Sequence, residues 1–161
     1  MGHTESNKGK AELRFQSTKK YLHSLGLSAC FRQWRAESHC HYLHGYSLQI
    51  ELVFGAVELD VRNWVVDFGS LGDIKQYLVD TFDHKTIVAS DDPELTYLKE
   101  GQKRGVLQLT ILEAVGCEKF AEHIYRVVEE WLFYAGYSTR CFLESVEVKE
   151  HEGNSAKVIR K

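Results

Sequence analysis

Residues 38–47, SHCHYLHGYS, place three histidines and one cysteine within ten positions. Imidazole and thiolate groups are preferred zinc ligands, and both also transfer protons near neutral pH. His44 begins a segment of alternating polarity, in which residues two places apart lie on the same face of a strand. A metal site there favours H-x-H, but Tyr46 holds the second position. A phenol with a pKa of about 10 is a poor ligand, so a third histidine must come from elsewhere.

Other histidines are available to complete a zinc site. His23 lies late in the first expected strand, and His39 and His41 lie in the loop before the second. Three neutral imidazoles with one open position are typical of a catalytic zinc centre. A single histidine in a strand or loop is usually structural, and we keep this interpretation for His41.

Cys40 is the cysteine whose sequence neighbours could change its reactivity. The chain has four cysteines, widely spaced and without a C-x-x-C pair, which fits neither a disulfide framework nor a cysteine-rich zinc finger. Only Cys40 lies among histidines, where a metal or an imidazolium could lower its pKa and expose a thiolate.

Two acidic positions could also carry chemistry. In FDHK, Asp83 precedes His84 directly after an expected helix. A carboxylate in contact with an imidazole fixes its tautomer and raises its basicity, as acid–base chemistry requires. Glu150 lies on the penultimate expected strand. A solvent-facing glutamate is the usual case, but in a pocket this carboxylate could accept both N–H donors of a 2-amino-4-oxo pyrimidine edge.

The elements that must position these residues follow from hydrophobic periodicity. Alternation places Leu48, Ile50, Leu52 and Phe54 on one face of the clearest strand. Residues 86–115 have mixed polarity and contain the only proline, so we expect a long connection with one short element at most. The expected elements are strands at 11–24 and 46–59, helices at 70–82 and 117–136, and strands at 142–153 and 155–160. This order indicates an α+β layer with an antiparallel sheet and helices on one face.

Composition sets the class of protein. With 161 residues and 43% hydrophobic content, we expect one globular domain over residues 11–161, after a flexible N-terminus at 1–10. The net charge of -3 is spread along the chain, which argues against nucleic acid as a partner. The sequence contains no apolar run of about 20 residues and begins with polar residues, so we expect a soluble, cytoplasmic protein with no membrane partner.

Five segments together resemble one enzyme family. CHYLHGY resembles the C-x-x-x-H-G-H motif of the 6-pyruvoyltetrahydropterin synthase and 6-carboxytetrahydropterin synthase family. In the same order, NWVVDF resembles the family's G-x-V-x-DF, FDH its L-DH pair, GCEKFA its T-x-E-N segment and VEVKE its V-x-V-x-E strand. The matches extend from about His23 to Glu150. The four-residue step from Cys40 to His44 is similar to that of the bacterial 6-carboxytetrahydropterin synthases.

The resemblance implies a reaction and a fold. The substrate is then 7,8-dihydroneopterin triphosphate, converted by a zinc-dependent carbon–oxygen lyase to 6-carboxy-5,6,7,8-tetrahydropterin, acetaldehyde and triphosphate, on the route to queuosine and other 7-deazaguanines. The implied fold is the tunnelling fold, a four-stranded antiparallel sheet with two helices on one face. The implied assembly is an oligomeric barrel, a hexamer of two trimers. The implied site residues are Cys40, Asp83 and His84 for catalysis, and Glu150, Glu118 and Cys117 for the pterin.

The chain also departs from the family pattern. Tyr46 replaces the second histidine of H-G-H, and the first-strand motif F-x-A-x-H has only the partial match KKYLH, ending at His23. We expect His39 to take the vacated position, so that Zn²⁺ is held by His23, His39 and His44. Between the motifs, LSACFRQWRAES does not align with the typical family loop, and its Arg32 and Arg35 could meet the triphosphate.

Three alternatives remain at this point. The protein could be a non-catalytic pterin- or purine-binding module, in which the lost histidine marks a lost metal. It could instead make the 6-pyruvoyl product. A related tunnelling-fold cyclohydrolase or a reductase of 7-deazaguanine nitriles is disfavoured by the C-x-x-x-H-G spacing.

Overall fold

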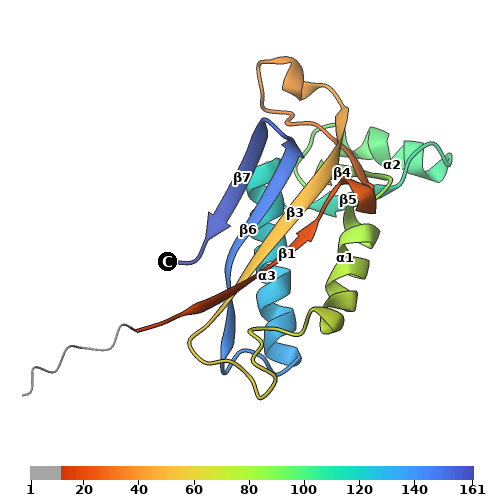
Figure 1. Cartoon of the computed structure of the whole chain (residues 1–161). Helices are drawn as coiled ribbons and strands as arrows, with labels where there is room; N and C mark the ends of the chain where they lie inside the picture. Colours follow the sequence, from red (N-terminus) through yellow and green to blue (C-terminus); the bar gives the residue numbers. More distant parts are fainter. Residues whose placement is uncertain (1–11) are drawn as a thin grey trace, which may run out of the picture.

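A single mixed sheet of seven strands forms the framework of the computed structural model, which describes residues 12–161 (Figure 1). The strands are β1 (Phe15–Tyr21), β2 (Leu27–Phe31), β3 (His44–Ala56), β4 (Lys85–Ala89), β5 (Leu109–Leu112), β6 (Cys141–His151) and β7 (Asn154–Ile159). The α-helices are α1 (Gly72–Phe82), α2 (Leu95–Lys103) and α3 (Cys117–Tyr134), and short 3-10 helices span His23–Leu25, His39–His41 and Phe68–Leu71. The expected flexible segment, residues 1–10, lies outside the described residues.

The hydrophobic core lies between the sheet and helices α1 and α3, which cover one face (Figure 1). As the alternation predicted, Leu48, Ile50, Leu52 and Phe54 of β3 are fully buried on this face. They pack in one cluster with residues of α1 and α3, including Ile74, Leu78, Phe120, Ile124 and Val128. None of the helices in the described part is both long and apolar enough to cross a membrane.

The expected α+β class is confirmed, but the expected sheet was too small. The described part has seven strands and three α-helices in place of four strands and two helices, and the sheet is mixed because β4 pairs in parallel with both β2 and β5. Strands β4 and β5 and helix α2 lie in the region expected to be a connection. Four of the five residues of β4 are buried, so this strand shows no alternation. A short continuous apolar run cannot be assigned to a strand by periodicity alone.

The strand β2 is the other unexpected element, and it determines what lies beside His44. It pairs antiparallel with the first part of β3, with Phe31 opposite His44 and Ala29 opposite Tyr46. Strand β1 pairs with the second part of β3, from Ile50 to Ala56. The two strands therefore follow one another along the same side of β3, with the short 3-10 helix at His23–Leu25 between them.

Candidate functional site

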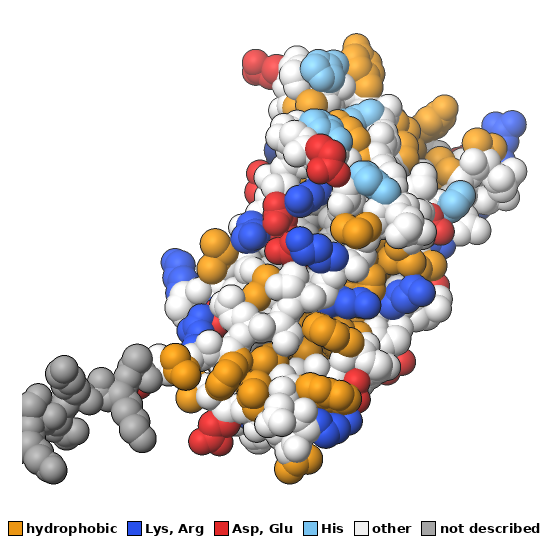
Figure 2. Space-filling view, viewed as in Figure 1, with side chains coloured by type: hydrophobic (Ala, Val, Ile, Leu, Met, Phe, Trp, Pro, Cys, Tyr) orange, Lys and Arg blue, Asp and Glu red, His pale blue; other side chains and the backbone are white. Residues whose placement is uncertain are grey.

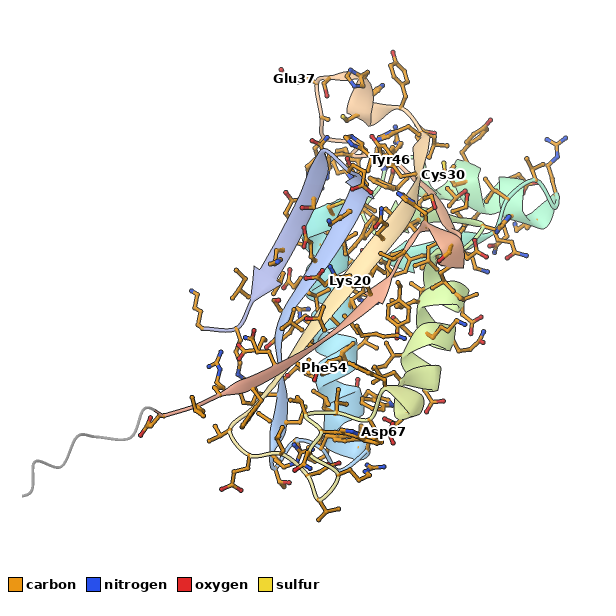
Figure 3. All side chains as sticks on the ribbon, in the orientation of Figure 1. Lys20, Cys30, Glu37, Tyr46, Phe54 and Asp67 are labelled. Atoms are coloured by element: carbon orange, nitrogen blue, oxygen red, sulfur yellow. The ribbon has the colours of Figure 1, made fainter. Side chains whose placement is uncertain are left out.

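The side chains with candidate chemistry gather at the end of the sheet where α3 begins. His44 and Tyr46 lie at the start of β3, Glu150 lies near the end of β6, and Cys117 and Glu118 open α3. Figure 3 shows Tyr46 at this end of the molecule and Asp67 at the opposite end. Pale-blue histidine side chains are concentrated at the same end in Figure 2.

The causes of two pKa shifts indicate that these side chains lie near one another. Burial raises the pKa of the Cys117 thiol to about 12, and the charge of Glu150, a hydrogen bond with the Glu150 side chain and the charge of Glu118 contribute to the shift. Partial burial raises the pKa of the Tyr46 phenol, with smaller contributions from Glu150, Cys40 and Cys117. The three residues expected to contact a pterin, Glu150, Glu118 and Cys117, are therefore brought together, and Cys40 lies close to them.

The Glu150 carboxylate is positioned to accept hydrogen bonds from a ligand. Among the described residues, no lysine, arginine or histidine forms an ion pair with it. The neighbouring start of α3 has no side-chain cap, because its N-cap is Gly116. The first N–H groups of a helix have no partner within the helix. A carboxylate beside such N–H donors is complementary to an amino-oxo heteroaromatic ring.

Ring side chains form a wall of the site on the same face of the sheet. The Phe31 and His44 ring centroids lie 5.3 Å apart, and those of His44 and Tyr46 lie 5.5 Å apart. Tyr46 also faces His151, at 6.0 Å. Phe31 is 3% exposed and packs edge-on against Phe120 of α3, at 5.0 Å. Helix α3 therefore supports both the ring wall and the carboxylate end of the site. Phe31 was missed from the sequence.

Cys40 is held in the short 3-10 helix His39–His41 and is partly exposed. The segment before this helix is anchored by Arg32, which forms two hydrogen bonds with the Asp92 carboxylate, at 2.9 and 2.6 Å, and also donates to the His41 carbonyl. Arg35 forms a hydrogen bond with Asp91, at 2.6 Å. Both arginines thus have carboxylate partners within the chain. For Arg32 this buried pairing argues against the expected role with a triphosphate.

The Asp83–His84 pair forms as the sequence suggested. His84 Nδ1 lies 2.8 Å from Asp83 Oδ1, which also accepts a hydrogen bond from the Ser28 amide of β2. His84 is exposed and has a backbone φ of 55°, in the left-handed region that non-glycine residues rarely adopt. The carboxylate can fix the tautomer of this imidazole. The contacts of this pair lie along β2, and in the described part no hydrogen bond joins it to the Glu150 group.

The three histidines expected to bind zinc are not brought together. His23 Nε2 lies 2.5 Å from Gln49 Nε2 and 3.7 Å from Glu152 Oε1. Gln49 is an odd-numbered residue of β3, so it faces away from His44 and Tyr46. His39 is exposed on its 3-10 helix. Within residues 12–161, no three histidine, cysteine, aspartate or glutamate side chains are arranged to hold a metal ion. The donor set within the described residues does not fit a three-ligand zinc.

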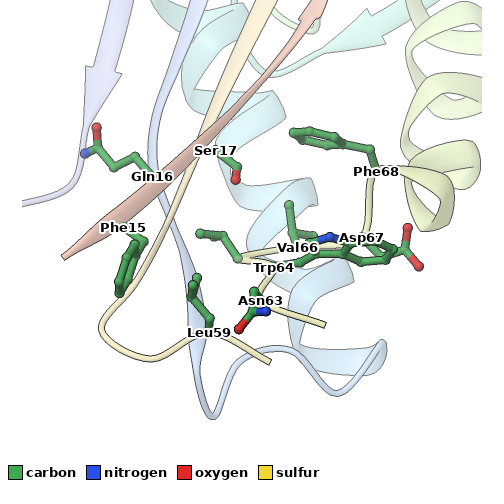
Figure 4. Close-up of a pocket in the computed structure, with 10 residues that line it drawn as sticks. Phe15, Gln16, Ser17, Leu59, Asn63, Trp64, Val66, Asp67 and Phe68 are labelled. Atoms are coloured by element: carbon green, nitrogen blue, oxygen red, sulfur yellow. The ribbon is translucent and has the colours of Figure 1, made fainter. Parts of the chain in front are cut away.

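A pocket of about 430 Å³ lies at the opposite end of the sheet (Figure 4). Its walls include Phe15, Trp64 and Phe68. The carboxylate that borders it, Asp67, already accepts the Gly69 amide at 2.8 Å and Arg62 at 3.2 Å. This pocket therefore lacks a free carboxylate to recognise an amino-oxo ring.

Comparison with known proteins identifies the family. The sequence model of the 6-pyruvoyl tetrahydropterin synthase family matches residues 23–161. The chain belongs to this family, and its α+β sheet is the tunnelling fold of that family.

Two relatives found by sequence bear the name of the 6-carboxy type of synthase. The 6-carboxy-5,6,7,8-tetrahydropterin synthase of Aquifex aeolicus is 27% identical over 113 residues, which cover 69% of this chain and 70% of the relative. The enzyme of the same name from Rickettsia felis is 33% identical over 60 residues, or 37% of this chain. That match spans only 44% of the length of the Rickettsia felis relative.

Solved structures share the fold at low identity. An uncharacterized protein from Wolinella succinogenes superimposes with a TM-score of 0.76 at 19% identity, covering 92% of this chain and 99% of that one. The 6-pyruvoyltetrahydropterin synthase of Plasmodium vivax superimposes with a TM-score of 0.63 at 15% identity, covering 92% and 98%.

Proposed function

We propose that the site around Glu150 recognises the 2-amino-4-oxo ring of a pterin. The carboxylate accepts the amino group and the adjacent ring N–H, two parallel charge-assisted hydrogen bonds. The first-turn N–H groups of α3 donate to the ring carbonyl, and Tyr46 offers an aromatic face beside them. One observation carries this proposal. The Glu150 carboxylate has no basic partner in the described part, and it lies next to the start of α3, which has no side-chain cap.

The reaction that we propose is of the 6-carboxy-5,6,7,8-tetrahydropterin synthase type. It converts 7,8-dihydroneopterin triphosphate and one water molecule to the 6-carboxy product, acetaldehyde and triphosphate, and would serve queuosine or 7-deazaguanine synthesis. The names of the Aquifex and Rickettsia relatives and the Cys40-to-His44 spacing support this reaction over 6-pyruvoyl formation. Cys40 takes a proton from the substrate side chain, and the family resemblance assigns the complementary acid–base role to His84, oriented by Asp83, although the contacts of this pair lie along β2.

A second candidate is a module that binds a pterin or purine without converting it. The specific observations in its favour are the aromatic side chains Phe31 and Tyr46 that flank His44, and the lack, within residues 12–161, of side chains arranged to hold the zinc on which the resembled lyase depends. Incubation of the purified protein with 7,8-dihydroneopterin triphosphate, followed by mass spectrometry, separates the two functions. Formation of the 6-carboxy product supports the synthase, whereas saturable binding with unchanged ligand supports the module.

Replacing Cys40 by alanine should abolish turnover but not binding. General acid–base groups contribute about 10²- to 10⁴-fold to rate, so we expect the product formed per minute to fall by at least about 100-fold. Pterin affinity should change little, because the ring is held by Glu150. The matched control is Cys30→Ala, which removes a half-buried thiol from β2, on the face opposite Phe31. Near-normal turnover in Cys40→Ala would show that this thiol has no catalytic role.

We also propose that the protein functions as a homo-oligomer. Strands β5 and β7 are the two ends of the main strand path, and β1 pairs only with β3 among the described strands. Unpaired strand edges favour pairing with other chains, and closure into a barrel removes them. Light scattering at micromolar concentration should give several times the mass of one chain, with a hexamer expected from the family. A monomer under these conditions would contradict the proposal.

A further inference from the structure

Three ring side chains form a triangle on the helix-facing side of β2 and β3. Phe31 and His44 are opposite each other in the antiparallel register, and Tyr46 is two residues further along β3. The centroid separations are 5.3 Å for Phe31–His44, 5.5 Å for His44–Tyr46 and 6.0 Å for Phe31–Tyr46. In a tetrahedral zinc site with Zn–N bonds of about 2 Å, two coordinated imidazole rings have centroids about 5 Å apart. The triangle therefore has the dimensions of a three-imidazole metal site.

The sequence around Phe31 supports the same interpretation. LSACF, the whole of β2, can be aligned with F-x-A-x-H: Ala29 matches, Leu27 stands in place of the phenylalanine and Phe31 in place of the histidine. This strand, and not the segment ending at His23, pairs with β3 at His44. The register therefore favours LSACF over KKYLH as the counterpart of that motif. Two of the three ring positions hold Phe31 and Tyr46, and only His44 keeps an imidazole.

His44 retains the arrangement of a metal ligand. Its Nδ1 lies 2.7 Å from the Tyr42 carbonyl oxygen, so Nδ1 carries the proton and the Nε2 lone pair is free. Metal-bound histidines commonly donate their second ring nitrogen to a carbonyl in this way. A lone imidazole does not hold zinc firmly, and the other two corners of the triangle offer a phenyl ring and a protonated phenol.

We infer that the family's three-histidine metal position has become a metal-free aromatic wall in this protein. The wall supports a planar ring held by Glu150, and the ligand class here rests on the proposed function. Phe31, packed on Phe120 and 3% exposed, belongs to the core and supports the wall from behind, so the partly exposed His44 and Tyr46 are the rings that face the ligand. A bound pterin is then held by its ring, with no metal to chelate the oxygen atoms of its side chain.

The test is the zinc content of the protein and of a variant that restores the triangle. Protein purified without chelator and dialysed against excess zinc should contain less than about 0.1 zinc per chain by elemental mass spectrometry. The double variant Phe31→His/Tyr46→His should take up about one zinc per chain and gain a zinc-dependent rise in melting temperature. Adding His44→Ala to that variant should remove both effects.

Each outcome decides the inference. About one zinc per chain in the unmodified protein would overturn it, and loss of that zinc in His23→Ala or His39→Ala would identify the ligands. A folded double variant that takes up no zinc would equally overturn the assignment of the triangle. Should the double variant fail to fold, Tyr46→His alone must show weaker zinc-dependent stabilisation that disappears with His44→Ala; its absence contradicts the inference. Zinc content is measured without pterin. Failure of the proposed function would therefore appear as absent pterin binding and turnover, with the zinc contents unchanged.

Discussion

Replacing Glu150 by glutamine is expected to weaken pterin binding by about 100-fold, the loss that one charge-assisted hydrogen bond of nearly 3 kcal/mol produces. The amide keeps the size of the side chain, but it offers one acceptor where the carboxylate offers two, and its NH₂ group opposes a donor of the ring. Fluorescence titration with 7,8-dihydroneopterin measures the effect.

The matched control for this prediction is Glu147→Gln on the same strand. Glu147 accepts a hydrogen bond from Ser155 and pairs with Lys157, so its carboxylate is occupied by neighbours on β7. Its substitution should leave pterin affinity within about twofold, a change small beside one hydrogen bond. Equal losses in both variants would indicate a general effect of charge on the ligand and would contradict the role assigned to Glu150.

The second large effect concerns the Arg32–Asp92 ion pair, which anchors the segment that precedes Cys40. Asp92→Ala is expected to lower the free energy of unfolding by about 3 kcal/mol, because it leaves the Arg32 guanidinium without its partner in a place where only 15% of that side chain is exposed. The Asp92 side chain itself is 1% exposed. Urea unfolding followed by circular dichroism measures the change.

The neighbouring pair provides the control. Arg35 and Asp91 are ion-paired too, but both side chains are largely exposed, and surface pairs contribute little. Asp91→Ala should therefore leave the unfolding midpoint nearly unchanged. If Asp91→Ala and Asp92→Ala destabilise the protein equally, burial of the Arg32–Asp92 pair does not explain the loss of stability in Asp92→Ala.

The same pair predicts a pH dependence. Burial raises the pKa of Asp92, but hydrogen bonds from Arg32 and from the Glu94 amide outweigh burial and give a net lowered pKa. A carboxyl group with a lowered folded-state pKa stabilises the protein fully above its unfolded pKa of about 4 and loses this contribution as the pH falls through the folded value. The stability difference between the unmodified protein and Asp92→Ala should therefore shrink only below about pH 4.

The sequence predicted the elements whose periodicity is long and regular. Strand β3 alternates over several residues and helix α3 has a continuous apolar face, so both were expected at nearly their observed positions. Strands β2, β4 and β5 have only five, five and four residues. Such segments carry too few periods to be assigned, and their strand character comes from pairing with distant parts of the chain.

The candidate site was predictable where neighbours in sequence are neighbours in space. His44 and Tyr46 lie on one face because they are two residues apart on a strand, and Asp83 contacts the adjacent His84. The gathering of Cys117 and Glu150 was expected only from family resemblance, since it depends on the packing of α3 against β6. Phe31 was missed because its role follows from the β2–β3 register, which the sequence does not state. The one residue of LSACF that matches F-x-A-x-H, Ala29, was the only sequence signal for the position of Phe31.

The central claim, that a pterin ring is recognised at Glu150, is tested most directly by a crystal structure of the protein with 7,8-dihydroneopterin. The account predicts the amino-oxo edge of the ring within hydrogen-bonding distance, about 2.6–3.2 Å, of both Glu150 carboxylate oxygens, with the ring carbonyl at the start of α3 and Tyr46 beside the ring. A ring bound in the pocket lined by Trp64, or bound near α3 without contact to Glu150, would contradict it.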